Sequence, residues 1–232
     1  MLASHYHNLN RLIFPMVCLI LLSACSSSAV RLQNLAKSDI NMVADSHIRQ
    51  SNELLRTLIV KLYKRNPREL NKTPGQTIAG RLAQIFADPA SLQFKELEMR
   101  QSIDAILLSF DENYSGDRVF ALGVGMRGML YKAYSEQSEL FLFDQLDAQK
   151  LYNSARNIEI IAWRLAHRRT SQGELFLLTN SIEKPVNLSF ERLFGKMIAL
   201  QDMMATITAD RTERTINKIV HSIASAVFLP VG

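Results

Sequence analysis

Apolar residues recur at steps of three and four along most of this chain, and no other feature of the sequence constrains its fold as strongly. The first series starts near Ser38 and ends at Asn66-Pro67, because the residue before a proline avoids the helical region. Its apolar members share one helix face: Ile40, Val43, Ala44, Ile48, Leu55, Leu58, Ile59 and Leu62. Further series cover residues 78–86, 97–110, 148–165 and 193–207. The spacing therefore predicts an all-α fold, with a single helical domain over residues 38–232.

Two of these series carry signals for their ends. Asp147 stands where a side chain can cap the helix over residues 148–165, and the polar segment HRRTSQG follows that helix. The last helix is expected to begin near Ser189. It is expected to bury a seam with coiled-coil spacing, formed by Leu193, Met197, Leu200, Met204 and Ile207. The polar segment DRTERT interrupts this pattern, which is expected to resume at Ile216, Ile219, Ile223 and Val227.

Two short apolar runs leave their structure open. Residues 139–143 (ELFLF) and 174–178 (ELFLL) are near copies of each other. They fit the same point of two similar helical hairpins, and they also fit two short buried strands joined by a crossover helix. Periodicity does not separate these arrangements for runs of only about four or five residues.

Residues 1–24 have the features of a targeting segment. They contain one base, Arg11, and no acid, and their apolar run over residues 12–22 is shorter than the roughly twenty residues that a permanent membrane-spanning helix needs. The segment ends in Leu22-Ser23-Ala24-Cys25, which resembles the lipobox of bacterial lipoproteins. We therefore interpret residues 1–24 as a signal peptide.

The resemblance implies that Cys25 becomes the mature N-terminus and is lipidated, with diacylglycerol and palmitate, on its thiol and its new amino group. Several acyl chains hold a protein at a membrane durably, since each buried methylene contributes about 0.8 kcal/mol and a single chain binds only marginally. Ser26, in place of an aspartate, implies export to the outer membrane. Residues 25–37 then form the lipidated N-terminus and tether, and the helical domain faces the periplasm.

The composition of the mature chain limits its partners. Removing Arg11 from the 27 bases leaves 26 bases against 22 acids, a net charge of +4. Such a small and dispersed charge argues against nucleic acid as a partner. Cys25 is then the only cysteine, so no internal disulfide is available and the apolar core must supply the stability.

Gly123, Gly125 and Gly128 have the spacing of the dinucleotide fingerprint G-x-G-x-x-G. That motif needs a strand before it, a helix after it and an acid about twenty residues on, for which RVFAL and Asp144 are candidates. A protein in the periplasm meets little free NAD, however, and the apolar residues in the rest of the chain have the spacing of helices. The neighbouring apolar residues also fit one helix face. We therefore expect a helix-packing element in which the glycines admit a neighbouring helix, with no cofactor.

No catalytic or metal-binding site is expected. The histidines of the mature chain, His47, His167 and His221, lack the i, i+4 spacing of a helical metal pair. The polar loop over residues 111–117 holds three acids that we interpret as solvating charges: Asp111, Glu112 and Asp117.

Two further features concern the surface. A basic cluster ends the helix over residues 148–165, and it is either ordinary charge at a helix C-terminus or a face for the phosphates of lipid headgroups. Its members are Arg164, His167, Arg168 and Arg169. The C-terminal segment ASAVFLPVG is apolar for a chain end, and it either docks on the domain or is a handle for a partner.

These features predict an outer-membrane lipoprotein with a non-enzymatic role, as a scaffold or assembly factor for a periplasmic envelope complex. Its partners are the membrane, through the lipid anchor, and envelope proteins, through helical surfaces. The anchor raises the local concentration of the protein for membrane partners. The alternative is a periplasmic enzyme or small-ligand-binding protein with a pocket near residues 117–144.

Overall fold

The computed structural model describes residues 39–137, 146–181, 186–218, 223 and 226–232. These residues form α-helices and short 3-10 helices, and the described ranges contain no strand. The elements are α3 (Asp39–Arg65), α4 (Pro67–Leu70), α5 (Ile78–Ile85), η2 (Pro89–Ser91), η3 (Lys95–Leu97), α6 (Ser102–Leu108), α7 (Arg118–Ala133), α8 (Ala148–His167) and α9 (Ser189–Thr212). The prediction of an all-α fold is confirmed.

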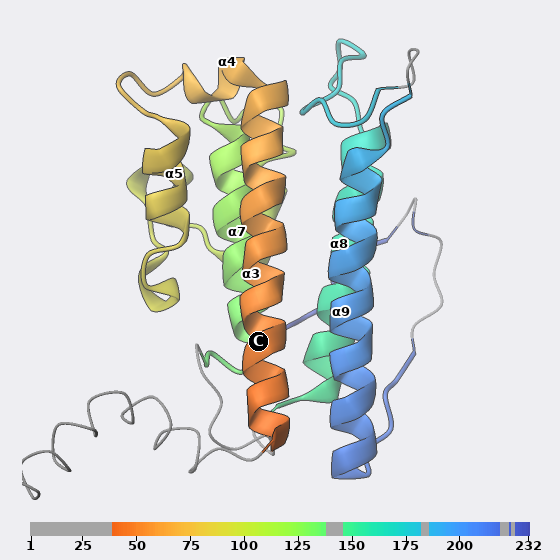
Figure 1. The fold of residues 1–232 in the computed structure, drawn as a ribbon. Coiled ribbons are helices and arrows are strands. Elements are labelled where there is room, and N and C mark those ends of the chain that lie inside the picture. Colours follow the sequence, from red (N-terminus) through yellow and green to blue (C-terminus); the bar gives the residue numbers. More distant parts are fainter. Residues whose placement is uncertain (1–38, 138–145, 182–185, 219–222, 224–225) are drawn as a thin grey trace, which may run out of the picture. The chain divides into compact units, whose positions relative to one another are not determined.

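The chain divides into two units, Met1–Val43 and Ala44–Gly232. Of the first unit, the structure describes only the start of α3. In the second unit, α3, α7, α8 and α9 lie side by side, and each runs opposite to the long helix before it in the chain (Figure 1). Helix α8 packs along α9, and α6 packs along α7. The shorter helices α4, α5 and α6 belong to the connection between α3 and α7.

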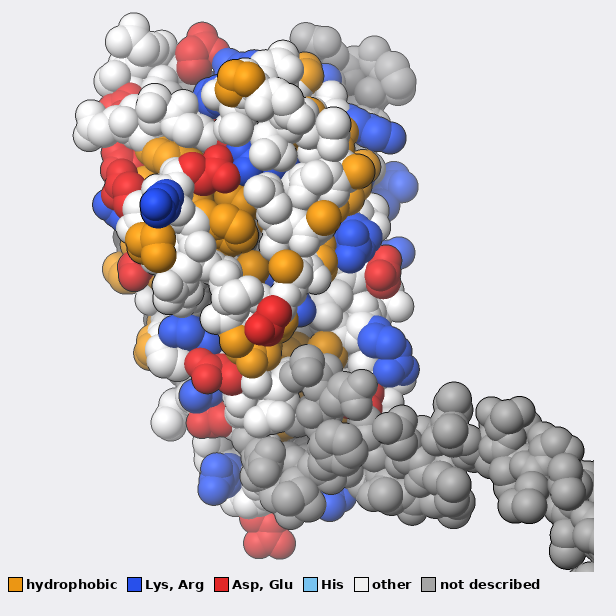
Figure 2. Space-filling view, turned by 90° about the vertical axis from the view of Figure 1, so that its left-hand side faces the viewer, with side chains coloured by type: hydrophobic (Ala, Val, Ile, Leu, Met, Phe, Trp, Pro, Cys, Tyr) orange, Lys and Arg blue, Asp and Glu red, His pale blue; other side chains and the backbone are white. Residues whose placement is uncertain are grey.

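Apolar side chains from every long helix meet in one core. They include Leu55, Leu58, Ile59, Phe120, Met126, Ile158, Ile161, Phe190 and Phe194. Burial of one such large side chain contributes about 1.5 to 3 kcal/mol, so this core can stabilise a chain without disulfides. On the face that carries α5, acidic and basic side chains are interspersed, and hydrophobic side chains show in several separate places (Figure 2).

Two predicted helix boundaries are confirmed. Helix α3 ends at Arg65, and Pro67 then occupies the first turn of α4, where its missing N–H leaves no bond unmade. The Asp147 carboxylate caps α8, since its Oδ1 accepts hydrogen bonds from Gln149 N at 2.8 Å and Lys150 N at 3.4 Å.

The predicted seam of α9 is wrong in its centre and in its continuation. Met197 and Met204 are buried, but the three other members of the seam are only half-buried. The buried row is Phe190, Phe194, Met197, Gln201, Met204 and Thr208, which has the same four-three spacing one residue further round the helix. The helix ends at Thr212, and Glu213 follows in a left-handed conformation with φ 52°. Of the described residues beyond it, 214–218 and 226–232 are not helical and residue 223 has a 3-10 conformation, whereas Ile219 lies outside the described residues.

The second of the two near-copy runs is neither helix nor strand. Residues 174–178 form an irregular segment with a single bridge between Arg169 and Leu175. Phe176 and Leu177 are nevertheless buried in the core. The first run, 139–143, lies outside the described residues.

The three glycines of the fingerprint lie inside α7, so the strand that a dinucleotide site requires is replaced by helix. A Cβ built on Gly125 would lie 2.6 Å from the backbone N of Ile106 in α6 and 2.8 Å from Ser102 O. A Cβ on Gly123 would lie 2.8 Å from Ile85 Cδ1. The prediction of a helix-packing element is confirmed, because the missing side chains admit α6 and the core side chains at short distance.

The apolar C-terminus docks on α8. Asn157 Nδ2 donates to Leu229 O at 2.8 Å, and Leu229 N donates to Asn157 Oδ1 at 2.7 Å. Asn153 Nδ2 also donates to Pro230 O at 2.7 Å, and Val231 is buried. The last residues therefore belong to the folded unit.

Candidate anion-binding site

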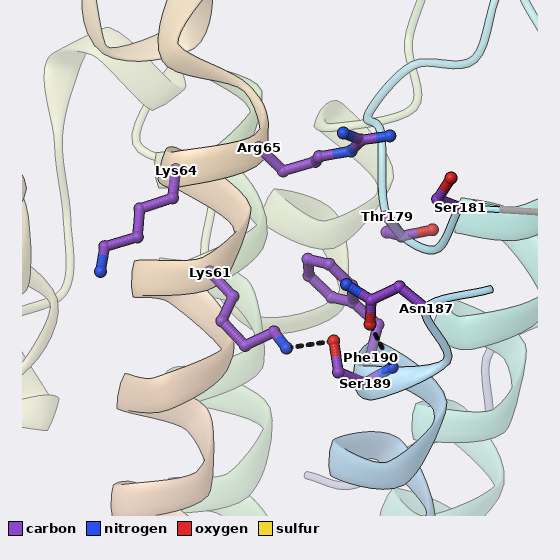
Figure 3. Close-up of a pocket in the computed structure, with 8 residues that line it drawn as sticks. All are labelled: Lys61, Lys64, Arg65, Thr179, Ser181, Asn187, Ser189 and Phe190. Atoms are coloured by element: carbon purple, nitrogen blue, oxygen red, sulfur yellow. Dashed lines mark hydrogen bonds between the residues drawn. The ribbon is translucent and has the colours of Figure 1, made fainter. Parts of the chain in front are cut away.

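A pocket of about 240 Å³ lies where α3 ends and α9 begins. We call it the α3–α9 pocket. Its lining consists of Lys61, Lys64, Arg65, Thr179, Ser181, Asn187, Ser189 and Phe190 (Figure 3). The last two turns of α3 supply all of the cations, and the opposite wall supplies neutral hydroxyl and amide groups.

Asn66 holds the two walls of the pocket together. It is 2% exposed, and its Nδ2 donates to Leu62 O and to Leu178 O, both at 2.9 Å. Its Oδ1 accepts from Leu178 N at 2.7 Å. A single buried amide therefore ties the irregular segment after Leu177 to the end of α3.

The same segment is closed by a short bridge. Ser181 N donates to Asn187 O at 3.2 Å, and Asn187 N donates to Ser181 O at 3.0 Å. Together with Asn66, this bridge sets Thr179 and Ser181 across from the basic end of α3.

Two cations face the neutral wall. The Lys61 side chain extends toward α9, donates a hydrogen bond to Ser189 Oγ, and has its Nζ 4.8 Å from the centre of the Phe190 ring (Figure 3). Arg65 extends toward Thr179 and Ser181, whereas Lys64 points away from them. In the described part of the chain, neither Lys61 nor Arg65 forms an ion pair with an acid. Among the described residues, no acid therefore neutralises the positive charge of the pocket.

The N-terminus of α9 adds to this positive potential. Ser189 N donates to Asn187 Oδ1 at 3.0 Å, and Phe190 N donates to Asn180 Oδ1 at 3.2 Å. Both first-turn amides thus point at neutral side-chain oxygens that an anion can replace. A long helix carries about half a positive charge at this end, which attracts anions.

The arrangement is suited to binding an oxyanion. Cations, hydroxyl groups and an amide surround the same volume, and ionic hydrogen bonds to such donors are roughly twice as strong as neutral ones. The lining named above contains no carboxylate, imidazole or thiol that would act as a general base or nucleophile. The cations and neutral donors of this lining are suited to the recognition of negative charge.

Comparisons with known proteins do not add to this description. The chain matches no protein-family model, no curated protein and no solved structure. The arguments for its function rest on the geometry and on the sequence.

The members of the basic cluster at the end of α8 have different contacts. The Arg164 guanidinium lies 4.5 Å from the centre of the Phe228 ring and donates to Ala226 O, so the docked C-terminus covers it. Arg169 donates to Gly173 O at 3.0 Å. His167 stacks on Trp163 with 4.9 Å between the ring centres. Arg164 is thus partly covered, whereas His167, Arg168 and Arg169 are exposed.

The acids of the 111–117 loop have three different environments. Glu112 is exposed and accepts a hydrogen bond from Ser171 N, and Asp111 Oδ1 accepts from Asn113 N at 2.9 Å. Asp117 is only 1% exposed and caps α7, where its Oδ1 accepts from Phe120 N at 2.9 Å. The interpretation as a solvating charge is wrong for Asp117.

Asp117 belongs to a buried cluster that we call the Arg81–Asp117 cluster. Arg81 is 0% exposed, its Nε lies 3.3 Å from Asp117 Oδ2, and its Nη1 and Nη2 lie 2.6 and 2.8 Å from the two carboxylate oxygens of Glu96. Tyr63 OH donates to Asp117 Oδ2 at 2.8 Å. Burial raises the pKa of the Asp117 carboxyl, which the hydrogen bonds from Phe120 N–H and Tyr63 and the charge of Arg81 oppose. Arg81, Asp117 and Tyr63 are buried, and Glu96 joins them from the surface with its side chain 34% exposed, so we interpret the cluster as structural.

The described histidines are isolated from one another. His47 is 7% exposed and its Nδ1 has no hydrogen-bond partner, so it is a buried side chain rather than a surface histidine. His221 lies outside the described residues. Within the described residues, no group of three or more His, Cys, Asp or Glu side chains is placed to hold a metal ion.

The burial of His47 predicts a dependence of stability on pH. Burial lowers the pKa of its imidazole below the ordinary 6.5, so the unfolded chain takes up a proton at a higher pH than the folded chain does. The stability is complete above about pH 6.5 and decreases as the pH falls toward the lower folded pKa. We expect His47→Gln to lose less stability between pH 7 and pH 5 than the unaltered protein. Thermal melts at each pH test this, with His167→Gln as the exposed control, and equal losses in all three proteins would contradict it.

Cys25 and the segment that resembles a lipobox lie outside the described residues. In the described part of the chain, no helix combines the length and the apolar character needed to cross a membrane. The stretch 117–144, where a ligand pocket was the alternative prediction, begins with the buried helix α7. A pocket does border its later half, around Arg127.

Proposed function

We propose that this chain is a lipid-anchored protein of the bacterial outer membrane that works by binding, and that the α3–α9 pocket holds a phosphate group of its ligand. One observation carries the binding part of the proposal. Lys61 and Arg65 face a wall of neutral donors at the positive end of α9, and no acid among the described residues pairs with them.

Phosphate fits this lining better than other common anions. It has several oxygens, which suits donors that approach from two walls, and it carries more charge than a carboxylate near pH 7. Helix N-termini and arginine side chains are both common partners of phosphate groups. The phosphate can belong to a lipid headgroup or to a soluble ester, because both present the same group.

The test compares charge variants of the full chain. We expect Lys61→Met combined with Arg65→Met to weaken binding of glycerol 3-phosphate at least about tenfold, since a hydrogen bond to a charged group contributes about 1.5 to 3 kcal/mol. Lys64→Met is the matched control, because this lysine has the same charge on the same helix but points away from the wall. Calorimetric titration measures all three affinities.

Two further arms separate the sources of the phosphate. The first arm compares binding to vesicles of phosphatidylglycerol and of phosphatidylcholine. Stronger binding to phosphatidylglycerol that is lost in the Lys61 and Arg65 variant indicates a lipid headgroup. Binding of glycerol 3-phosphate alone indicates a soluble ester. Equal affinity of the double variant and the unaltered chain for every probe would remove this site from the account.

The anchor part of the proposal rests on Leu22-Ser23-Ala24-Cys25 after a short apolar run. We expect Cys25→Ala to abolish labelling of the protein by a fatty-acid analogue in cells and to remove the protein from the membrane fraction. Because the resemblance implies that the lipid is attached to the cysteine thiol, the conservative Cys25→Ser should behave in the same way. Continued labelling of either variant would place the lipid elsewhere.

A scaffold or assembly role is the second candidate, and a groove between α8 and α9 favours it. This groove has a volume of about 410 Å³ and a largely apolar lining that includes Trp163, Phe194 and Ile198. A half-buried tryptophan in such a lining is suited to an apolar side chain of an envelope protein. The test is copurification of one defined partner from intact envelopes. Loss of this partner with Trp163→Ala, but not with the Lys61 and Arg65 variant, would favour the scaffold role over phosphate binding.

A further inference from the structure

Arg127 is a buried cation that has no anionic partner among the described residues. It lies on α7, is 9% exposed, and forms no hydrogen bond or ion pair with any described residue. Its Nε is enclosed and has no acceptor. The Arg127 guanidinium lies over the ring of Phe86, with its Cζ 5.8 Å from the ring centre. Arg56 lies over the same ring, with its Cζ 4.1 Å from the centre.

Such an arrangement is unfavourable in the empty protein. A buried charge is normally paired, because removal from water costs far more than an aromatic ring returns. Burial lowers the pKa of the Arg127 guanidinium, Tyr131 opposes this effect, and the neighbouring cation Arg56 reinforces it. The missing component is therefore a negative charge.

The guanidinium borders a pocket of about 140 Å³ between α3 and the second half of α7, which we call the Arg127 pocket. Arg49, Ser51, Asn52, Tyr131 and Gln137 supply polar groups to its lining, and none of the described lining residues is an acid. Arg49 is exposed and donates to Ser46 Oγ at 2.8 Å, so it lies at the rim.

Two polar lining residues of the Arg127 pocket, Ser51 and Tyr134, already form hydrogen bonds within the protein. Gln201 Nε2 donates to Ser51 Oγ at 3.1 Å and to Tyr134 OH at 3.0 Å, and Ser154 Oγ donates to Gln201 Oε1 at 3.0 Å. This network joins α3, α7, α8 and α9. Among the residues described around this pocket, Arg127 is the buried cation whose Nε has no acceptor.

The lining also has an apolar part. Ile48 and Leu130 border the same volume, next to the rings of Tyr131 and Tyr134. A volume of about 150 Å³ is sufficient to hold a benzene molecule in an apolar cavity, so this pocket has room for one small ring. A phosphate group alone would leave the apolar wall unused.

We propose that the Arg127 pocket binds the carboxylate of a small organic acid, with the acid's apolar body against Ile48 and Leu130. A planar guanidinium presents two parallel N–H groups to the two oxygens of a carboxylate. This site is separate from the α3–α9 pocket and does not depend on the function proposed there.

Benzoate is the probe, benzamide is its neutral isostere, and inorganic phosphate is the competing anion. We expect saturating benzoate, but neither of the other two, to raise the melting temperature of the full chain by several degrees. Arg127→Met should weaken benzoate binding at least about 30-fold, as expected when one partner of a buried charge pair is removed. Arg56→Met is the matched control, since Arg56 covers the same Phe86 ring but does not line the pocket. It should change the affinity less than about fivefold.

The melting temperature without ligand separates this role from a structural one. If Arg127 serves a ligand, Arg127→Met removes an unpaired buried charge and should melt at the same or a higher temperature than the unaltered chain. A variant that melts lower or does not fold would overturn the proposal, since the fold would then need the cation. Arg127→Lys, which keeps the charge but not the paired donors, should still fold and bind benzoate about tenfold more weakly. If phosphate or benzamide raised the melting temperature as much as benzoate does, the assignment of a carboxylate would also be overturned.

Discussion

Replacement of Arg81 by methionine is expected to lower the free energy of unfolding by about 3 to 5 kcal/mol, the typical cost of breaking a buried ion pair by removing one partner. The physical reason is the environment of Asp117. This carboxylate is 1% exposed, and without Arg81 it keeps only the hydrogen bonds from Tyr63 OH and Phe120 N. Glu96 would also lose both of its bonds to Arg81, at 2.6 and 2.8 Å. Urea unfolding of the purified chain measures the change.

Arg100 provides the matched control for this prediction. It pairs with Glu98 at 2.7 Å, but its side chain is 40% exposed and that of Glu98 is 58% exposed. Exposed pairs contribute about 0 to 1 kcal/mol, so Arg100→Met should have little effect. Addition of Asp117→Asn to Arg81→Met should recover part of the loss, because the uncompensated charge is then removed. Similar destabilisation by Arg81→Met and Arg100→Met would show that the Arg81–Asp117 cluster is not a buried network.

A second large effect is expected at Gly125. An alanine Cβ at this position would lie 2.6 Å from Ile106 N and 2.8 Å from Ser102 O, and a backbone atom cannot move aside as a flexible side chain can. Overpacking of this kind costs about 1 to 3 kcal/mol or more, which exceeds the gain of about 1 kcal/mol that alanine brings to a helix interior. We expect Gly125→Ala to destabilise the protein by about 2 kcal/mol, as measured by the midpoint of urea unfolding.

Gly195, in α9, is the control with the opposite expected sign. A Cβ built there meets nothing within 4 Å. Gly195→Ala should therefore stabilise the protein by about 0.5 to 1 kcal/mol through helix propensity alone. If Gly125→Ala also stabilised the protein, the close approach of α6 to α7 would be wrong.

The helices were predictable because their signals are local. Asp147 caps the helix that follows it directly, and Pro67 stops the helix that precedes it directly. The glycines of α7 were assigned to helix packing for a similar reason, since the apolar residues between them share a helix face. Each of these inferences uses residues that lie within a few turns of one another.

The parts that were not predictable depend on residues far apart in the chain. The buried row of α9 includes two polar residues, Gln201 and Thr208, so a pattern based on apolar residues alone predicts a row that is displaced by one residue. Gln201 is buried because it forms hydrogen bonds with distant residues of the chain, Ser51, Tyr134 and Ser154. Asp117 follows directly on a polar loop and looks like a loop acid, but its contacts with Tyr63, 54 residues earlier, and with Arg81 make it a core residue.

The α3–α9 pocket illustrates the same limit. Its two walls are 128 residues apart where Lys61 meets Ser189. The segment KLYKR, at the end of the first apolar series, was the one local signal for the basic wall, and basic residues in a last helical turn are common for electrostatic reasons alone. No local pattern indicates that neutral donors face them.

The central claim is that the α3–α9 pocket binds a phosphate group, and the amide signals at the N-terminus of α9 test it most directly. In a titration of the isotope-labelled full chain with glycerol 3-phosphate, followed by nuclear magnetic resonance, we predict saturable shifts of the Ser189 and Phe190 amides. The Lys61 and Arg65 side-chain signals should follow with the same dissociation constant. Signals at the opposite end of α9, near Thr212, should stay in place. Shifts that do not saturate, or that saturate elsewhere while Ser189 and Phe190 are unmoved, would contradict the account.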